Sequence, residues 1–231
     1  MDFVLYELCG ADGRSFSPYC WRTRMALAHK GIHPALRKVR FTDIPAIADG
    51  VRTVPVLVHG AATVRDSWDI AVWLDENLSG APGLFAGDGE RRLARFMHHW
   101  VITQLHPLIF RAIAADIWDR LDAADQPYFR ASREQRLGAV TLESLRAQQP
   151  ATIAQLRSTL APLRGLLGEQ QFVGGALPTY ADYIAFGALQ WPRVVGNVAL
   201  LEPGDPVAGW FERCLDLHGG LGRAEPAART A

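Results

Sequence analysis

The residues best suited to chemistry lie in the short tract Ser17-Pro18-Tyr19-Cys20, which brings a hydroxyl, a phenol and a thiol close together. A serine followed by a proline is typical of a helix start, with Ser17 as the N-cap and Pro18 at the first helical position. That pattern alone is more often structural than functional. Because the tract follows the first predicted strand, Ser17 is expected at the carboxyl edge of a sheet, where α/β proteins bind ligands. No histidine or carboxylate nearby in the sequence is evident as its base, so we predict a hydrogen-bond donor rather than a nucleophile.

Two further tracts place polar groups where a ligand could use them. Pro55 interrupts the apolar run 54–58, either as an edge-strand proline or through a cis Val54–Pro55 bond that leaves the Val54 N–H and C=O free for an extended ligand. Asp66-Ser67 precedes a helical run, so backbone donors gather there and a carboxylate group fits. A plain helix cap is the alternative interpretation, and the residues alone leave both open.

The remaining polar residues favour structural roles. His98 and His99 are adjacent and so do not share a helix face, and His99 and His106 have no suitably placed acidic residue between them; we predict no metal site. Thr179 and Asp182 have the spacing of a capping box, which stabilises a helix start.

The three cysteines Cys9, Cys20 and Cys214 are odd in number and far apart. This favours free thiols in a reducing compartment, and the cytoplasm is the expected location. We expect Cys20, one turn into its helix, to be a small buried hydrophobic residue rather than a reactive thiol.

The elements that position these residues differ between the two halves of the chain. In the first half, extended runs alternate with helical ones, which predicts a β-α-β unit and then a hairpin through Gly60 and a further helix. The predicted elements of this half are 3–8, 18–30, 35–41, 54–59, 63–65 and 67–78. Glycine and proline then crowd residues 80–89, which marks a linker.

Beyond residue 90 the strand pattern disappears. Apolar residues recur at spacings of three and four from Leu93 to Ile109, with Pro107 expected to kink or interrupt that helix. Further helices are predicted over 132–147, 150–167, 179–191 and 206–218. The expected fold class is therefore α/β plus all-α, with an α/β domain over 1–80, a linker over 81–90 and a helical domain over 91–231.

Composition narrows the classes of partner. The 231 residues include 24 Lys plus Arg and 24 Asp plus Glu, so the bulk charge that attracts nucleic acid or an anionic membrane is missing. There is no basic leader followed by an apolar segment, and no uninterrupted apolar run approaches the roughly 18 residues of a membrane span. We expect neither nucleic acid nor a membrane as a partner.

These tracts together resemble a known family. Ser17-Pro18-Tyr19-Cys20 is similar to the thioredoxin Cys-Pro-Tyr-Cys motif with serine in place of the first cysteine, which removes dithiol exchange. The tract 53–57 resembles the cis-proline strand of glutathione S-transferases, and Asp66-Ser67 their acidic-serine pair. Residues 172–175 and 178–183 are similar to their capped, buried helix. The resemblance covers the whole chain and implies a thioredoxin-like domain followed by a helical bundle.

Within that superfamily the sequence most resembles bacterial β-etherases, which cleave β-aryl ethers derived from lignin with glutathione. The similar tracts are 17–19, 21–23, 30–31, 132–135 and 217–223. The resemblance implies glutathione as co-substrate, an aromatic small molecule as acceptor and a homodimer. It leaves open a general conjugating or dehalogenating transferase, or a non-catalytic interaction module.

The resemblance also assigns roles to individual residues. It implies Ser17 as the catalytic residue that stabilises the glutathione thiolate. The implied glutathione-binding residues are Ser17, Arg52, Val54, Pro55, Asp66 and Ser67, and the implied acceptor-site residues are Tyr19, Trp100 and Phe110. Arg52 departs from the family pattern, which commonly places a basic residue nearer the cis proline, where this chain has Thr53.

Overall fold

A four-stranded sheet forms the first part of the protein, whose computed structural model describes residues 2–228. Its strands are β1 (Phe3–Leu8), β2 (Ala35–Val39), β3 (Val56–His59) and β4 (Ala62–Arg65), in the order β2-β1-β3-β4. β1 and β2 are parallel, whereas β3 is antiparallel to both β1 and β4. The β-α-β unit and the hairpin are therefore confirmed, and Gly60 supplies the positive φ of 58° that the hairpin turn requires.

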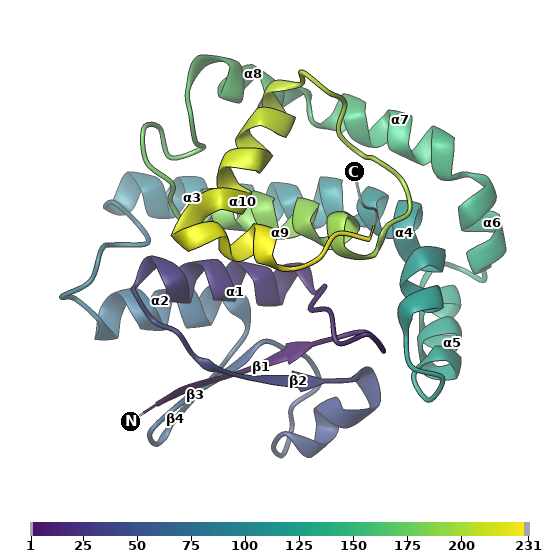
Figure 1. Cartoon of the computed structure of the whole chain (residues 1–231), viewed down its shortest axis with the longest axis horizontal. Helices are drawn as coiled ribbons and strands as arrows, with labels where there is room; N and C mark the ends of the chain where they lie inside the picture. The colour runs from purple at the N-terminus through teal and green to yellow at the C-terminus, as the bar shows by residue number, and fades with distance from the viewer. Residues whose placement is uncertain (1, 229–231) are drawn as a thin grey trace.

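Two helices, α1 (Pro18–His29) and α2 (Ser67–Asn77), lie on the side of the sheet that faces the rest of the molecule (Figure 1). Ser17 is the N-cap of α1 as predicted, and Gly31 follows its end with a φ of 72°. A 3₁₀ helix, η1 (Phe41–Ala46), follows β2. This is the thioredoxin-like arrangement that the family resemblance implied.

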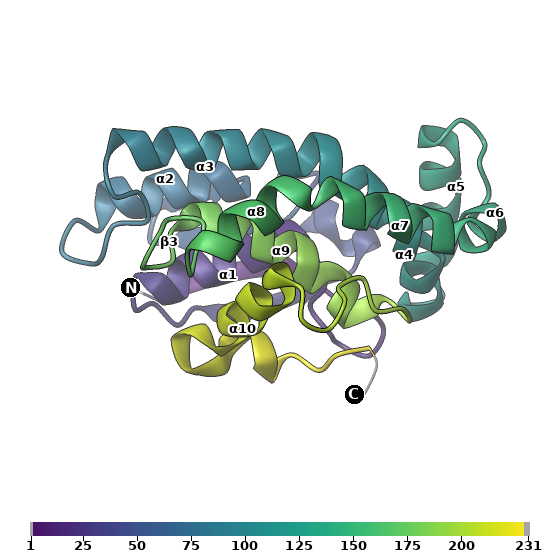
Figure 2. The same cartoon turned by 90° about the horizontal axis from the view of Figure 1, so that it is seen from above.

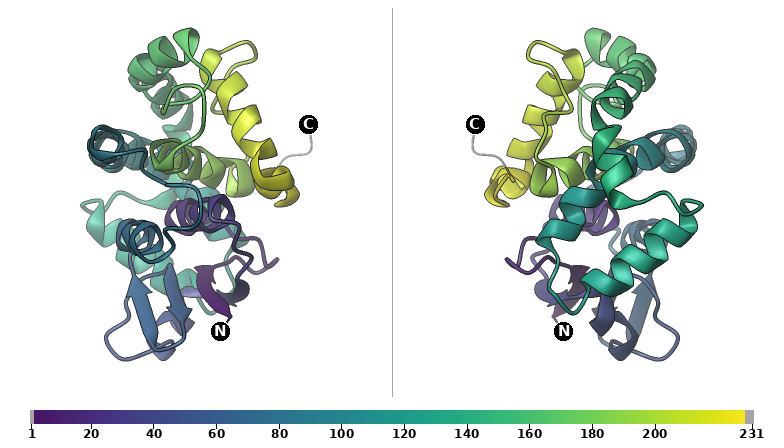
Figure 3. Two further views of the ribbon diagram at one scale, coloured as in Figure 1. Left: turned by 90° about the vertical axis from the view of Figure 1, so that its left-hand side faces the viewer. Right: turned by 90° about the vertical axis from the view of Figure 1, so that its right-hand side faces the viewer.

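The second part of the chain is helical. Its elements are α3 (Asp88–Trp100), η2 (Val101–Leu105), α4 (His106–Arg120), α5 (Gln126–Arg136), α6 (Leu142–Ala147), α7 (Gln149–Thr159), α8 (Ala161–Glu169), α9 (Tyr180–Val195) and α10 (Pro206–Ala224). The end views in Figure 3 show the sheet at the bottom and most of these helices above it, with α9 packed on α1. No helix within residues 2–228 has both the length and the apolar character needed to cross a membrane.

The helices α3 and α4 form one long rod (Figure 2). The interruption predicted at Pro107 is present as the π-helical turn η2, and Pro107 occupies the first turn of α4. A π turn widens the helix where a proline would otherwise clash with the preceding turn.

Two predicted helices are wrong because each is divided in the structure. The prediction over 132–147 covers parts of α5 and α6, which are separated where Gly138 and Ala139 adopt positive φ values of 71° and 64°. The prediction over 150–167 covers α7 and α8, which meet at Leu160, just before Pro162. Proline has no N–H to continue the hydrogen bonds of the preceding helix.

α9 is the central helix of the core, with nearly all of its side chains buried. Gly187 lets α1 approach it: a Cβ at this position would lie 2.4 Å from the Pro18 carbonyl oxygen. The capping box at the start of α9 is present, since the Thr179 N–H donates to Asp182 Oδ2 over 3.0 Å. Asp182 also accepts hydrogen bonds from backbone N–H groups of 173–174 and from the Trp210 indole.

Candidate active site

Ser17 lies at the start of α1, in the loop that leaves β1. Its Oγ accepts a long hydrogen bond of 3.4 Å from the Cys20 N–H, and only 6% of the residue is exposed. The loop before it is anchored, because the Trp21 indole donates to the Ser15 carbonyl and the Ser15 hydroxyl donates to Glu7. Since its oxygen is used as an acceptor, the Ser17 hydroxyl proton remains available for a ligand.

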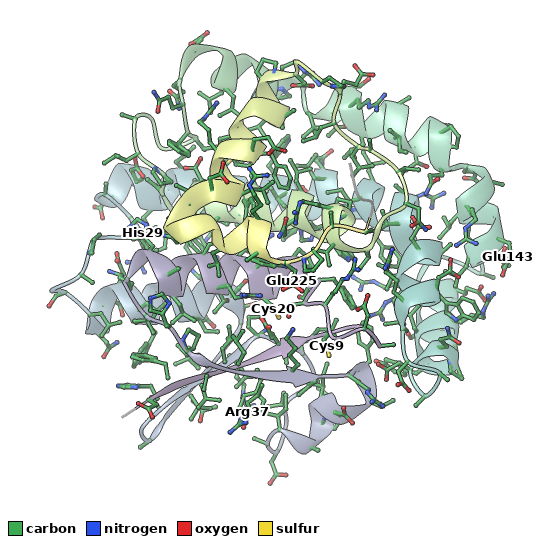
Figure 4. All side chains as sticks on the ribbon, in the orientation of Figure 1. Cys9, Cys20, His29, Arg37, Glu143 and Glu225 are labelled. Carbon is green, nitrogen blue, oxygen red and sulfur yellow. The ribbon has the colours of Figure 1, made fainter. Side chains whose placement is uncertain are left out.

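The thiol closest in sequence to Ser17 is inert. Cys20 is fully buried, and burial raises the pKa of its thiol to about 12. Figure 4 shows it between α1 and the sheet, inside the protein. The expectation that Cys20 is a small buried residue is confirmed.

The Val54–Pro55 peptide bond is cis, as the resemblance implied. Both residues are buried just before β3. None of the backbone hydrogen bonds of the turns, loops and caps described for residues 2–228 involves Val54. The Val54 N–H and C=O therefore remain available to an extended ligand beside the sheet. Arg52 is exposed nearby and donates to the Val51 carbonyl.

The start of α2 carries the third group of polar atoms. Asp66 is its N-cap and accepts from the Trp68 N–H over 2.7 Å, with a φ of 70° that aspartate tolerates better than most residues. Ser67 is only 1% exposed, and its Oγ has no hydrogen-bond partner within residues 2–228. Arg95 of α3 lies over the Trp68 ring, 3.7 Å from its centroid, and so brings a positive charge beside this helix start.

A buried arginine connects α1 with the helical part. Arg22 is fully buried, and its guanidinium lies 3.3 Å from His98 Nδ1 and 3.4 Å from His106 Nε2. It also lies over the Tyr19 ring, 4.8 Å from the centroid, and its Nε has no partner within residues 2–228. We call Arg22, His98, His106 and Tyr19 the buried-cation cluster.

The histidines of this cluster are neutral. Burial, and then the charge of Arg22, lower the pKa of His98 to about 4 and hold that of His106 well below its usual value. Burial likewise lowers the pKa of the Arg22 guanidinium, whose ordinary value lies so high that it stays protonated. The permanent charge of the cluster therefore resides on Arg22.

An aromatic row begins at Tyr19. Its ring meets His106 edge-on at 5.2 Å, His106 meets Trp191 at 5.8 Å, and Trp191 stacks on Phe110 at 6.0 Å. We call Tyr19, His106, Trp191 and Phe110 the aromatic row. Of the three residues predicted for the acceptor site, the structure connects Tyr19 and Phe110, whereas none of the ring contacts described for residues 2–228 joins Trp100 to the row.

Comparisons with known proteins identify the family. Residues 16–77 match the glutathione S-transferase N-terminal domain, and residues 93–214 match the glutathione S-transferase C-terminal domain. The chain belongs to the glutathione S-transferase family. The two matched domains correspond to the thioredoxin-like and helical parts of the structure.

Solved structures of the family share this fold. The chain is similar to glutathione transferase GSTFuA3 from Phanerochaete chrysosporium, at 25% identity and a TM-score of 0.78, over 100% of this chain and 99% of that chain. It is similar to CsGST63524 of Ceriporiopsis subvermispora, a structure in complex with glutathione, at 20% identity and a TM-score of 0.80, over 100% of both chains. A glutathione S-transferase from Rhodospirillum rubrum F11 has 20% identity and a TM-score of 0.72, over 99% of this chain and 95% of that chain.

Sequence reasoning missed Arg22, His98, His106 and Trp191 as members of the site. The sequence pattern could have indicated Arg22, because it lies on the apolar face of α1, four residues after Pro18 and three before Met25. A charged side chain on a buried helix face is costly unless it has hydrogen-bonding or charged partners, so its presence points to such partners. The histidines carried no such pattern, because their common neighbour lies 76 and 84 positions away in the sequence.

Proposed function

We propose that this glutathione S-transferase uses glutathione as co-substrate to cleave β-aryl ether bonds of aromatic compounds derived from lignin. The observation that carries the proposal is the position of the aromatic row, which begins two residues from the Ser17 hydroxyl. A thiolate held at Ser17 would thus meet an aromatic acceptor on the helical side of the cleft. The sequence tracts shared with β-etherases support the choice of ether.

Glutathione fits the polar groups of the thioredoxin-like domain. The free N–H and C=O of Val54 would pair with its cysteinyl backbone as an added strand does. The α-carboxylate of its γ-glutamyl end would lie at the start of α2, where it supplies a partner for Ser67 Oγ, with the Asp66 carboxylate facing the α-ammonium group. Arg95 adds attraction for the carboxylate, and Arg52 lies at the surface for the glycine end.

The proposed reaction is a displacement. A free thiol has a pKa of about 8.5, so a hydrogen-bond donor and the positive end of α1 are needed to raise the fraction of thiolate at neutral pH. Ser17 supplies the donor. The thiolate attacks the β-carbon, a C–S bond forms, the C–O bond breaks, and the electron pair leaves with the phenolate. The products are a glutathione thioether and a phenol.

The domain division expected from the sequence has a role in this proposal. Residues 1–80 would bind glutathione, residues 81–90 would link the domains, and residues 91–231 would supply the acceptor site. A homodimer is also part of the proposal, as in the family, and Phe96 of α3 offers an apolar contact because 65% of it is exposed. Sedimentation of a single monomeric species across a dilution series at micromolar concentration would contradict the dimer.

The test is incubation of the protein with glutathione and a racemic β-aryl ether ketone. We expect equal amounts of released phenol and glutathione thioether, identified by mass spectrometry. Chiral chromatography of the remaining ether then gives the stereochemical preference. Turnover of chlorodinitrobenzene without ether cleavage would instead indicate a general conjugating transferase. Absence of glutathione binding would indicate an interaction module.

A further inference from the structure

The buried-cation cluster contains a charge that the proposed glutathione site does not use. Arg22 makes no ion pair with any carboxylate of residues 2–228, although it is fully buried. A buried charge of this kind is costly unless something nearby benefits from it. Its two guanidinium NH₂ groups both contact neutral histidine rings.

The hydrogen-bond directions in the cluster follow from the chemistry of arginine. A guanidinium only donates, so His106 Nε2 must accept from Arg22 over 3.4 Å. Because His106 is neutral, its single ring proton is then on Nδ1. Nδ1 lies 3.3 Å from the Tyr19 hydroxyl oxygen, which therefore accepts the bond. The Tyr19 hydroxyl proton is left to point away from His106, and Tyr19 is half-buried rather than enclosed.

We infer that the Tyr19 hydroxyl donates a hydrogen bond to the ether oxygen of the leaving aryloxide, with Arg22 acting through His106 as the positioning pair. This inference rests on the proposed ether cleavage. As the C–O bond breaks, its electron pair moves onto the ether oxygen and Tyr19 O–H stabilises the charge there. The phenolate then leaves and takes its proton from water.

The arrangement separates the two charges that change during the reaction. Ser17 stands at the cap of α1 and would face the sulfur, which loses charge, whereas the Tyr19 hydroxyl contacts His106 of α4 and would face the oxygen, which gains charge. The chain Arg22, His106, Tyr19 transmits a permanent positive charge toward that oxygen. Preorganised donors of this kind stabilise a transition state without rearranging during the reaction.

The experiment compares leaving groups. The Tyr19→Phe variant removes one oxygen atom from a half-buried ring and should fold. Single-turnover rates with saturating glutathione are measured for ethers of 4-nitrophenol and 4-methoxyphenol. We expect a loss of about tenfold or less for the nitro compound, whose anion needs little help, and about 10² to 10³ for the methoxy compound. Tyr128→Phe, which alters an exposed tyrosine of α5, is the matched control and should change neither rate.

Two further measurements separate this role from others. The ultraviolet absorbance of bound glutathione as a function of pH gives its thiol pKa, which we expect to be the same in Tyr19→Phe as in the wild type. His106→Phe should also reduce the rate more for the methoxy than for the nitro ether, because it removes the link to Arg22 while keeping a ring in place.

The outcomes are distinct. An equal loss for both leaving groups would overturn the inference, and so would a raised thiol pKa, which would place Tyr19 at the sulfur. In either case the wild type still cleaves ethers. A wild-type protein that binds glutathione but cleaves neither ether would refute the proposed function itself, and the inference with it.

Discussion

Ser17→Ala tests the proposed thiolate site most directly, because it removes one hydroxyl and nothing else. The hydroxyl has two separable roles in the structure. Its oxygen caps α1 through the long bond from the Cys20 N–H, and its proton is available to the glutathione sulfur. Loss of an N-cap costs roughly 0.5–2 kcal/mol, and at 3.4 Å we expect the lower end of that range.

The loss of the hydrogen bond to the glutathione thiolate should cost more free energy than the loss of the N-cap. A hydrogen bond to a charged group contributes about 1.5–3 kcal/mol, which corresponds to a rise of roughly 1–2 units in the pKa of bound glutathione. If the pKa returns to the free-thiol value of about 8.5, the thiolate fraction at pH 7, and kcat with it, should fall by about 10- to 25-fold. Some activity should remain, because the start of α1 and its backbone N–H groups are unchanged.

The assay is a spectroscopic titration of bound glutathione, with kcat and the unfolding temperature measured on the same samples. Thr141→Ala is the matched control: its hydroxyl caps α6 by accepting from the Ser144 N–H over 3.2 Å. It should lose similar stability and keep the thiol pKa. If Ser17→Ala behaves like Thr141→Ala in all three measurements, Ser17 is only a cap. Complete inactivation with intact glutathione binding would indicate covalent chemistry at Ser17.

Three further results are expected. Asp66→Asn keeps the cap and tolerates the positive φ but removes the charge, so KM for glutathione should rise roughly tenfold with kcat nearly unchanged; a collapse of kcat at constant KM would contradict this role. Thr179→Ala should lower the unfolding free energy by on the order of 1 kcal/mol or less, because the hydrogen bond from its hydroxyl to Asp182 is 3.5 Å long. Asp182→Ala should lower it by on the order of 3 kcal/mol or more, because several buried N–H groups lose their acceptor. Chemical denaturation distinguishes the two variants, and a stable but inactive Thr179→Ala would refute the structural role. Burial lowers the pKa of His218 from 6.5 to about 4, so the folded state takes up its proton less readily than the unfolded chain; stability is fully present above about pH 6.5 and is lost as pH falls toward 4. His218→Asn should reduce that loss in unfolding measured against pH, while His33→Gln, an exposed control, should not.

The sequence by itself determined the elements whose ends are marked by single capping or turn residues. Ser17-Pro18 and Gly31 mark the two ends of α1, and Gly60 marks the hairpin, because each residue type satisfies a backbone requirement at its own position. The resemblance to glutathione S-transferases added the cis bond at Pro55. The divisions at 137–139 and at Leu160 were missed because the apolar pattern was followed across Gly138 and Pro162, which break helices and stand at these divisions in the sequence.

Only the tertiary structure decided which side chains meet in the site. His98 of α3 and His106 of α4 reach Arg22 of α1 because all three helices pack on α9, and the approach of α1 to α9 depends on the missing Cβ of Gly187 next to Pro18. The same packing leaves Trp100 outside the aromatic row and brings Trp191 into it. Helical spacing fixes which residues share a face of one helix, but the partner of that face is set by close packing between helices far apart in sequence. The burial of Arg22 could have been read from its place on the apolar face of α1, whereas the neutral histidines follow from packing between distant helices, which no local pattern records.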